Sequence, residues 1–373
     1  MRIGVPKETK TDEFRVGLVP ESVRELTEMG HDVAVETNAG IGISASDDDY
    51  RKFGATVLDS AQEVFEHADM IVKVKEPLAP ERAMLRENQI LFTYLHLAPD
   101  PEQTRDLVNS GAVCIAYETV TDDNGALPIL APMSKVAGRM AVQEGAWCLE
   151  RPHGGTGMLL GGVPGVEPAK VVIIGGGVVG THATHIAVGM GADVWVLDRN
   201  VKVLDNHWVQ FGRSTNGVYS TRSMLEKHVV DADLVIGAVL VPGATAPRLV
   251  SKEMIRQMRP NSVVVDVAID QGGCFETSRA TTHSEPTYRV HDVTHYCVAN
   301  MPGAVPKTST YALNNVVLPF CANIANLGYK KALQQDSNLR AGLNVCHGKV
   351  TYREVAESLG YDYVSAETAL AAA

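Results

Sequence analysis

The sequence predicts an α/β protein built from two doubly wound, Rossmann-like domains, with the second domain inserted into the first. Two observations predict this class. Short apolar strand patterns alternate with helix patterns along the first third of the chain, which is typical of a parallel sheet. A second alternation begins near residue 170, where a glycine-rich turn joins a strand to a helix. We therefore expect a discontinuous domain over residues 1–130 and 309–373 that encloses a second domain over residues 131–308.

The first 130 residues supply a regular series of strands and helices, and Gly30 and Gly54 end two of the helices. The predicted strands cover residues 2–5, 31–36, 55–58, 70–74, 90–94 and 113–116. The predicted helices cover residues 20–29, 47–53 and 61–67. This order is the βαβ pattern of a parallel sheet.

The middle of the chain departs from this rhythm. A longer helix is predicted over residues 134–150, with Ser134 as its N-cap. Residues 153–168 hold six glycines and two prolines, and we interpret them as either a linker or a mobile loop. Further on we expect strands over residues 234–240, 262–266 and 296–298, then a helix over residues 313–327 and a polar tail.

The glycine-rich turn has the properties of a dinucleotide pocket. A β-branched strand over residues 171–174 runs into Gly175, Gly177 and Gly180, which have G-x-G-x-x-G spacing. These glycines allow a sharp turn, close approach of a pyrophosphate, and tight packing of helix on strand. The next strand, residues 193–197, ends on Asp198, whose carboxylate can accept both ribose hydroxyls and would repel a 2′-phosphate.

A glycine-rich turn by itself is equally consistent with an ordinary strand-to-helix connection that binds no nucleotide. Here strand, glycines, helix, second strand and terminal acid occur together, and this context favours the dinucleotide interpretation. We expect NAD as the cofactor. Arg199, directly after the acid, leaves NADP open.

Bulk properties exclude several other classes. With 373 residues and a net charge of −11, the chain lacks the basic face that nucleic acid or an anionic membrane requires. Six cysteines lie far apart without C-x-x-C spacing, which is typical of buried thiols in a reducing compartment. The first residues lack a signal-peptide core and no apolar run approaches the length of a membrane span, so we expect a cytoplasmic protein.

Two basic side chains could hold a substrate carboxylate. Arg15 lies in a polar loop before a helix, where its guanidinium could make two parallel hydrogen bonds; a solvated surface arginine is the alternative. Lys73 and Lys75 alternate in an otherwise apolar strand, which places both on one face. Lys75 is the better ligand because it is nearer the strand's carboxyl end, and a salt-bridged or partly buried lysine is the alternative.

Two further residues could take part in proton exchange or substrate orientation. His96 ends a strand-like run, where it is either a general acid/base or a core histidine. Asp270 follows a predicted strand and precedes a glycine turn, so it faces the nicotinamide or merely caps the turn. Open α/β sheets bind ligands at the carboxyl ends of their strands, and we expect the substrate in a cleft between the two domains.

Five blocks of the sequence resemble the alanine dehydrogenase family. They are GVPKETKTDEFRVGLVPESV at 4–23, the glycine-rich run at 173–199, VIGAVLVPGATAP at 235–247, VDVAIDQGGCFETSR at 265–279 and YCVANMPGAVPKTSTYAL at 296–313. By this resemblance, Arg15 and Lys75 bind the carboxylate and carbonyl region of the substrate. His96 is the acid/base, and Asp270 completes the active site beside the nicotinamide.

The resemblance also implies the set of residues that bind NAD. They are Ser134, Gly175, Gly177, Val178, Val179, Gly180, Asp198, Ser220, Val239, Leu240, Val267, Ala268, Ile269, Asp270, Arg279, Val298, Ala299, Asn300 and Met301. An adenosine contact of some relatives is not transferred because this chain has Val203 there, and no metal site is transferred because Asn323 and Leu327 are poor ligands. The family is usually a homohexamer.

The implied reaction is the NAD-dependent, reversible oxidative deamination of L-alanine to pyruvate and ammonium. Three alternatives remain open at this point. The chain could be the nucleotide-binding subunit of a transhydrogenase, a saccharopine-type amino-acid dehydrogenase, or a non-catalytic NAD-binding protein. The sequence decides neither the physiological direction nor the range of 2-oxo acids that are accepted.

Overall fold

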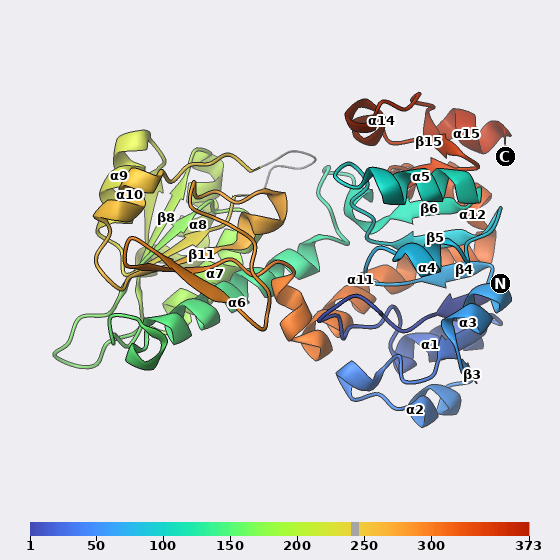
Figure 1. Ribbon diagram of the computed structural model, residues 1–373, viewed down its shortest axis with the longest axis horizontal. Coiled ribbons are helices and arrows are strands. Elements are labelled where there is room, and N and C mark those ends of the chain that lie inside the picture. Colours follow the sequence, from blue (N-terminus) through green and yellow to red (C-terminus); the bar gives the residue numbers. More distant parts are fainter. Residues whose placement is uncertain (240–245, 373) are drawn as a thin grey trace. The chain divides into compact units, whose positions relative to one another are not determined.

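The computed structural model describes residues 1–239 and 246–372 (Figure 1). The chain forms two compact units. The first unit contains Met1–Met133 and Gly303–Ala373, and the second contains Ser134–Pro302. The chain therefore leaves the first unit, completes the second and returns. Each unit is a sheet covered by helices, which confirms the predicted class of two Rossmann-like units with one inserted into the other.

The sheet of the first unit has eight strands in the order β15-β14-β6-β5-β4-β1-β2-β3. The strands are β1 (Arg2–Val5), β2 (Asp32–Glu36), β3 (Thr56–Leu58), β4 (Met70–Val72), β5 (Ile90–Thr93), β6 (Val113–Ala116), β14 (Leu343–Cys346) and β15 (Lys349–Val350). The six N-terminal strands are parallel, and β14 adds to β6 in antiparallel orientation. The prediction of a polar tail was therefore wrong, because the C-terminal segment extends this sheet.

The sheet of the second unit has seven strands in the order β12-β13-β11-β10-β7-β8-β9. The strands are β7 (Lys170–Ile174), β8 (Asp193–Asp198), β9 (Thr215–Tyr219), β10 (Leu234–Gly237), β11 (Val263–Asp266), β12 (Thr287–Val290) and β13 (Val293–Tyr296). All pairs are parallel except β12 with β13. The predicted strand over 296–298 was wrong because β13 ends at Tyr296, and β9 was not predicted.

Helices cover both sheets. In the first unit they are α1 (Pro20–Glu28), α2 (Asp47–Lys52), α3 (Ala61–His67), α4 (Ala79–Arg82), α5 (Pro101–Ser110), α11 (Pro306–Leu327), α12 (Tyr329–Gln335), α13 (Ser337–Arg340), α14 (Arg353–Leu359) and α15 (Ala366–Ala372). In the second unit they are α7 (Val178–Gly189), α8 (Val201–Phe211), α9 (Arg222–Val230) and α10 (Lys252–Gln257). Helix α6 (Ala131–Leu149) begins three residues before Ser134, so the prediction of Ser134 as an N-cap was wrong.

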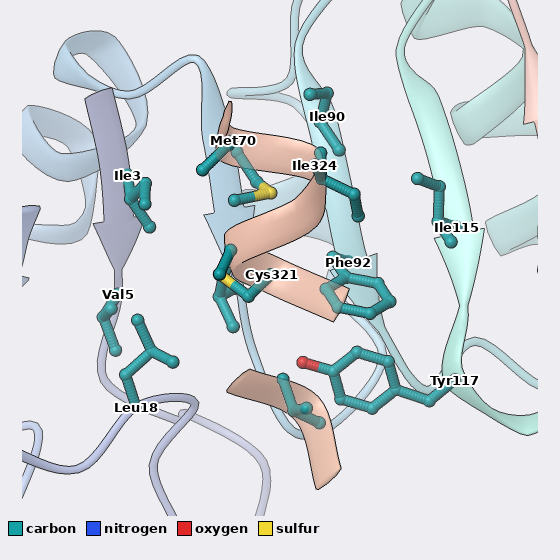
Figure 2. Packing of buried hydrophobic residues seen from close by; sticks show 14 of the residues in the cluster. Ile3, Val5, Leu18, Met70, Ile90, Phe92, Ile115, Tyr117, Cys321 and Ile324 are labelled. Carbon is teal, nitrogen blue, oxygen red and sulfur yellow. The ribbon is translucent and has the colours of Figure 1, made fainter. Parts of the chain in front are cut away.

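Helix α11 packs on one face of the first sheet. Its buried residues Leu313, Val317, Cys321 and Ile324 recur at spacings of three and four, which places them on one helical stripe. Figure 2 shows Cys321 and Ile324 against side chains of the central strands, including Phe92. The neighbouring residue of β5, Leu91, belongs to the core on the opposite face. Burial on both faces explains why these strands read as continuous apolar runs.

The six parallel strands have the same order in both sheets, and this order locates the edge at which a ligand is expected. In the first unit the order reverses between β1 and β4, and in the second it reverses between β7 and β10. In open α/β sheets, ligands bind at the carboxyl ends of strands beside such a reversal. Each unit therefore offers one such edge.

Candidate functional site

The turn after β7 needs glycine at the first and last positions of its motif. Gly175 has φ of +96°, a left-handed conformation that favours glycine. A β-carbon on Gly180 would lie 1.8 Å from the carbonyl oxygen of Gly175, so α7 packs directly against the end of the strand. A β-carbon on Gly177 would meet no heavy atom within 4 Å. The turn is thus closed on the protein side and open at Gly177.

Asp198 lies beside this turn at the end of β8. Its Oδ2 accepts a hydrogen bond from the backbone N–H of Gly176 at 2.8 Å, and its Oδ1 accepts one from the N–H of Asn200 at 2.7 Å. Each carboxylate oxygen can accept a further donor. An open helix N-terminus next to a fixed carboxylate fits the pyrophosphate and the adenosine ribose of a dinucleotide.

The other predicted cofactor residues mostly follow the carboxyl ends of strands in the same sheet. Ser220 comes directly after β9, Val239 follows β10, and Val298 follows β13. The short helix Val267–Gln271, which follows β11, contains Ala268, Ile269 and the exposed Asp270. The remaining positions after β13 are Ala299, Asn300 and Met301. Leu240 lies outside the described residues.

Three predicted cofactor residues have particular surroundings. Val178 at the start of α7 is 46% exposed, whereas Val179 is buried. Arg279 lies over the ring of Tyr288, with 4.1 Å between its guanidinium carbon and the ring centroid. A side chain held against an aromatic ring in this way keeps its charge in a defined place.

Asp266 is a buried residue of this edge that sequence reasoning missed. It ends β11 and accepts hydrogen bonds from the N–H of Ala268 at 3.0 Å, the N–H of Cys274 at 2.9 Å and the hydroxyl of Ser278 at 2.5 Å. Burial raises the pKa of Asp266, and these donors oppose that rise. The carboxylate thereby anchors the loop that carries Asp270. An acid that ends an apolar strand is the signal that could have identified it.

In the first unit, Arg15 is almost completely buried and paired. Its Nε lies 2.6 Å from Oε1 of Glu13, and its Nη2 lies 2.5 Å from Oε2. Its Nη1 lies 3.0 Å from the sulfur of Met133. The solvated surface arginine considered as the alternative is therefore wrong. The fork of Arg15 does grip a carboxylate, and in this structure the carboxylate belongs to Glu13.

Strand β4 ends at Val72 and includes neither Lys73 nor Lys75. The two lysines also differ in their surroundings. Lys73 is fully buried, with its Nζ 3.1 Å from Oε2 of Glu8 and 2.7 Å from Oε1 of Glu81. The predicted alternation of both lysines along one strand face was therefore wrong. The side chain of Lys75 is 15% exposed, and its Nζ lies 3.7 Å from Oε2 of Glu76. Lys75 is therefore the more accessible of the two lysines.

The buried partners of Lys73 were also missed by sequence reasoning. Burial raises the pKa of Glu8, and the nearby ammonium of Lys73 opposes this rise. For Lys73, burial alone would lower the pKa, but the charges of Glu8 and Glu81 raise it above its ordinary value. Lys73 therefore stays charged and links the loop after β1 to α4 below the carboxyl end of β4.

His96 follows β5 in a strained backbone conformation, with φ of +51°. Its N–H donates to Oε1 of Glu118 at 2.6 Å, and its ring lies parallel to that of Tyr94 with centroids 5.9 Å apart. The side chain is 48% exposed, so the core-histidine alternative is wrong. Glu118 thus fixes the backbone while the imidazole remains accessible for proton exchange.

Comparison with known proteins identifies the family. Residues 4–137 match the family model for the N-terminal domain of alanine dehydrogenase/PNT, and residues 141–353 match the model for its C-terminal domain. The chain belongs to the alanine dehydrogenase/PNT family. An alanine dehydrogenase of Halomonas elongata is 55% identical over 98% of this chain and 99% of its own length.

Two solved structures have a fold similar to that of this chain. A structure titled L-alanine dehydrogenase matches with a TM-score of 0.94 and 53% identity, over 96% of this chain and 99% of the other. A transhydrogenase from Sinorhizobium meliloti matches with a TM-score of 0.80 and 26% identity, over 95% of this chain and 99% of the other. The fold is thus common to both, and the sequence is much closer to the first.

Two further findings concern this alanine dehydrogenase/PNT family member. Among the described helices, none is long and apolar enough to cross a membrane. Over residues 1–239 and 246–372, no group of three or more histidine, cysteine, aspartate or glutamate side chains is arranged to hold a metal ion.

Proposed function

We propose that this protein is an NAD-dependent L-alanine dehydrogenase, which converts L-alanine, NAD⁺ and water reversibly to pyruvate, ammonium, NADH and a proton. The observation that carries this proposal is the whole-chain similarity to alanine dehydrogenases at 50–55% identity. Arg15, Lys75 and His96 lie in loops that follow strands of the first sheet, and Asp270 lies in the short helix that follows β11 of the second. The first unit binds the substrate and the second binds the dinucleotide.

A bound dinucleotide would supply a hydride acceptor, C4 of its nicotinamide ring, for the α-carbon of alanine. The chain holds it through the backbone of Gly175, Gly177 and Gly180, with Val178 and the other predicted cofactor residues around it. Asp198 favours NAD over NADP because its carboxylate would meet a 2′-phosphate as a like charge at short range. Gly176 and Asn200 keep that carboxylate in place through their N–H groups.

Arg15 and Lys75 hold the substrate. The ion pair with Glu13 fixes the plane of the Arg15 guanidinium before a substrate arrives. A substrate carboxylate then meets an oriented cation, and less conformational freedom is lost on binding. Lys75, whose ammonium is loosely paired with Glu76, polarises the group on C2 of the substrate.

His96 exchanges protons with the substrate. After oxidation the substrate is an imino acid, and His96 takes a proton as water adds to it. His96 returns a proton as ammonia leaves, which yields pyruvate. Its exposed ring on a fixed backbone suits both steps. Asp270, on a loop anchored by Asp266, orients the substrate nitrogen or the attacking water.

We also propose a cytoplasmic homohexamer. The location rests on six cysteines that are all buried free thiols, as expected in a reducing compartment. The assembly rests on the family resemblance, and light scattering of the purified protein tests it.

One assay separates this function from its alternatives. NADH oxidation is followed with pyruvate, with and without ammonium. An alanine dehydrogenase oxidises NADH only when both are present. Equal rates without ammonium indicate a hydroxy-acid dehydrogenase. NADH binding without pyruvate-dependent oxidation favours a transhydrogenase subunit or a non-catalytic binding protein, and a requirement for a second amino acid favours the saccharopine type.

A further inference from the structure

The peptide backbone of Gly176, the residue inside the glycine turn, is held from several sides. Its N–H donates to Asp198, as described above. Its carbonyl oxygen lies 2.9 Å from Nε2 of His207 and accepts a second hydrogen bond from the hydroxyl of Thr181 at 3.1 Å. Nε2 of His207 also lies 3.2 Å from the hydroxyl oxygen of Thr181. A carbonyl oxygen can only accept, so the tautomer that satisfies the contact with Gly176 is the one with the proton on Nε2, and the Thr181 oxygen can then accept from the same N–H. His207 lies in α8, outside the glycine motif.

His207 is buried, with 2% of its surface exposed. Its Nδ1 is also buried and finds no hydrogen-bond partner among the described residues. A buried acceptor without a partner reduces stability, and a purely apolar side chain would avoid this loss. The advantage of an imidazole over an apolar side chain at this position is therefore its hydrogen bond from Nε2 to the glycine turn.

Packing closes the turn on the side of α8. A β-carbon on Gly176 would lie 2.6 Å from Cγ1 of Val203 and 3.0 Å from Nε2 of His207. On Gly177, by contrast, a β-carbon would meet open space. A trans peptide is planar, with its C=O and N–H pointing in opposite directions. When His207 holds the carbonyl of Gly176, the N–H of Gly177 in the same peptide therefore points away from α8.

We propose that His207 is a positioning residue of the dinucleotide site. It orients the peptide between Gly176 and Gly177 so that the N–H of Gly177 faces the pyrophosphate before the dinucleotide arrives. Thr181 supports the same carbonyl from α7. This inference rests on the proposed function, because it concerns how the dinucleotide is bound. Without the hydrogen bond from His207, the peptide between Gly176 and Gly177 adopts other orientations as well. The dinucleotide then binds only the fraction of molecules in which the N–H of Gly177 faces the pyrophosphate, and the apparent affinity falls.

Calorimetric titration of the full-length protein with NADH tests the proposal. The variants are His207→Leu, which removes the donor, and His207→Gln, whose amide can restore it. His228→Leu is the matched control, because His228 is buried in α9 of the same unit, packs on Trp195 and also has an unpartnered Nδ1. We expect His207→Leu to raise the Kd for NADH about tenfold, as the loss of one positioning hydrogen bond implies.

The remaining readouts separate positioning from general stability. His207→Gln should bind NADH within about twofold of the unaltered protein, since its amide restores the donor. His228→Leu makes the same change away from the glycine turn and should leave the Kd for NADH unchanged, whatever its effect on the melting temperature. In turnover, His207→Leu should raise KM for NADH and change kcat little.

Several outcomes would overturn the proposal. An unchanged Kd in His207→Leu does so, and so does an equal weakening in His228→Leu. If His207→Leu does not fold, Thr181→Val removes a donor from the same carbonyl and should raise the Kd about threefold; an unchanged Kd there also overturns the proposal. If the unaltered protein fails to bind NADH, the proposed function itself is wrong.

Discussion

Arg15 and Glu13 form a two-point ion pair that solvent hardly reaches. Both bonds involve one edge of the guanidinium, the edge with Nε and Nη2, at 2.6 and 2.5 Å. The side chains are 2% and 0% exposed. A buried pair of this kind constrains the arginine because breaking it leaves an uncompensated charge inside the protein. Glu13 therefore determines how Arg15 is presented to a substrate.

Glu13→Gln should destabilise the protein and weaken substrate binding. The buried guanidinium loses its counter-charge, so we expect the free energy of unfolding to fall by about 3 kcal/mol. KM for alanine should rise because Arg15 is less firmly oriented. Urea unfolding and initial rates measure these effects. Glu28→Gln is the control, since Glu28 pairs with Arg24 at the surface, and it should change neither quantity. Equal behaviour of the two variants would contradict the argument.

Lys73→Met should destabilise the protein in a pH-dependent way. Removing the ammonium leaves Glu8 and Glu81 buried without their shared cation, and we expect a loss of about 3–5 kcal/mol near neutral pH. The pKa of Glu8 is already raised by burial, and Lys73 opposes this rise. In the variant the pKa of Glu8 in the folded protein therefore rises further.

The sign of the pH effect follows from linkage. A carboxyl group with a raised pKa in the folded state contributes stability below its ordinary pKa, and this stability is lost as the pH rises through the folded pKa. The difference in unfolding free energy between Lys73→Met and the unaltered protein should thus shrink when the pH falls from about 7 to about 5. Urea unfolding at both pH values measures it. A difference that is the same at both would show that Glu8 does not take up a proton there.

His96→Asn should nearly abolish turnover and leave NADH binding intact. Asparagine tolerates the left-handed backbone at this position, whereas alanine would add strain. An amide cannot exchange protons, so kcat should fall by at least about 100-fold. His291→Asn is the control, because His291 is exposed and has a similar φ of +49°. If His96→Asn lowers thermal stability but the folded fraction turns over normally, the residue is structural.

Gly177→Ala should separate dinucleotide binding from folding. A β-carbon at this position meets no atom of the described protein, so the melting temperature should stay unchanged. The methyl group would stand where the pyrophosphate approaches, and overlap of this kind raises the Kd for NADH about tenfold or more. Gly189→Ala, at the other end of α7, also fills open space and should leave binding unaltered. Tight NADH binding by Gly177→Ala would mean that the turn is not the pyrophosphate site.

Asp198→Asn should relax the preference for NAD over NADP. The amide keeps the size of the side chain but removes the charge that repels a 2′-phosphate. The ratio of kcat/KM for NADP to that for NAD should therefore rise about tenfold or more, which corresponds to about 1.4 kcal/mol. If the unaltered protein already uses NADP as well as NAD, then Asp198 does not act on the ribose, or Arg199 offsets it.

The strand, turn and helix around the glycine motif could be predicted from the sequence because their signals are local. Within about thirty residues the chain places a β-branched strand, three spaced glycines and a terminal acid, and each constrains its own backbone. The structure accordingly places Asp198 beside the turn, with its carboxylate on the N–H of Gly176. The helix predicted over residues 313–327 also exists, because helical spacing depends on neighbouring residues, but α11 begins earlier, at Pro306.

The burial of charged side chains was decided only by the tertiary structure. The sequence left a solvated Arg15 open and placed Lys73 and Lys75 on one strand face, whereas Arg15 is buried against Glu13, and Lys73 is enclosed by Glu8 and Glu81. Glu13 is only two residues from Arg15, but the burial of that pair is set by the surrounding fold. Glu8 lies 65 residues from Lys73, and no local period records that the two meet. The same holds for His207, which reaches Gly176 across 31 residues. Local sequence determined the elements of this protein, and long-range packing decided which charges and hydrogen bonds support its site, because the free energy of a buried polar group depends on the partner that it finds.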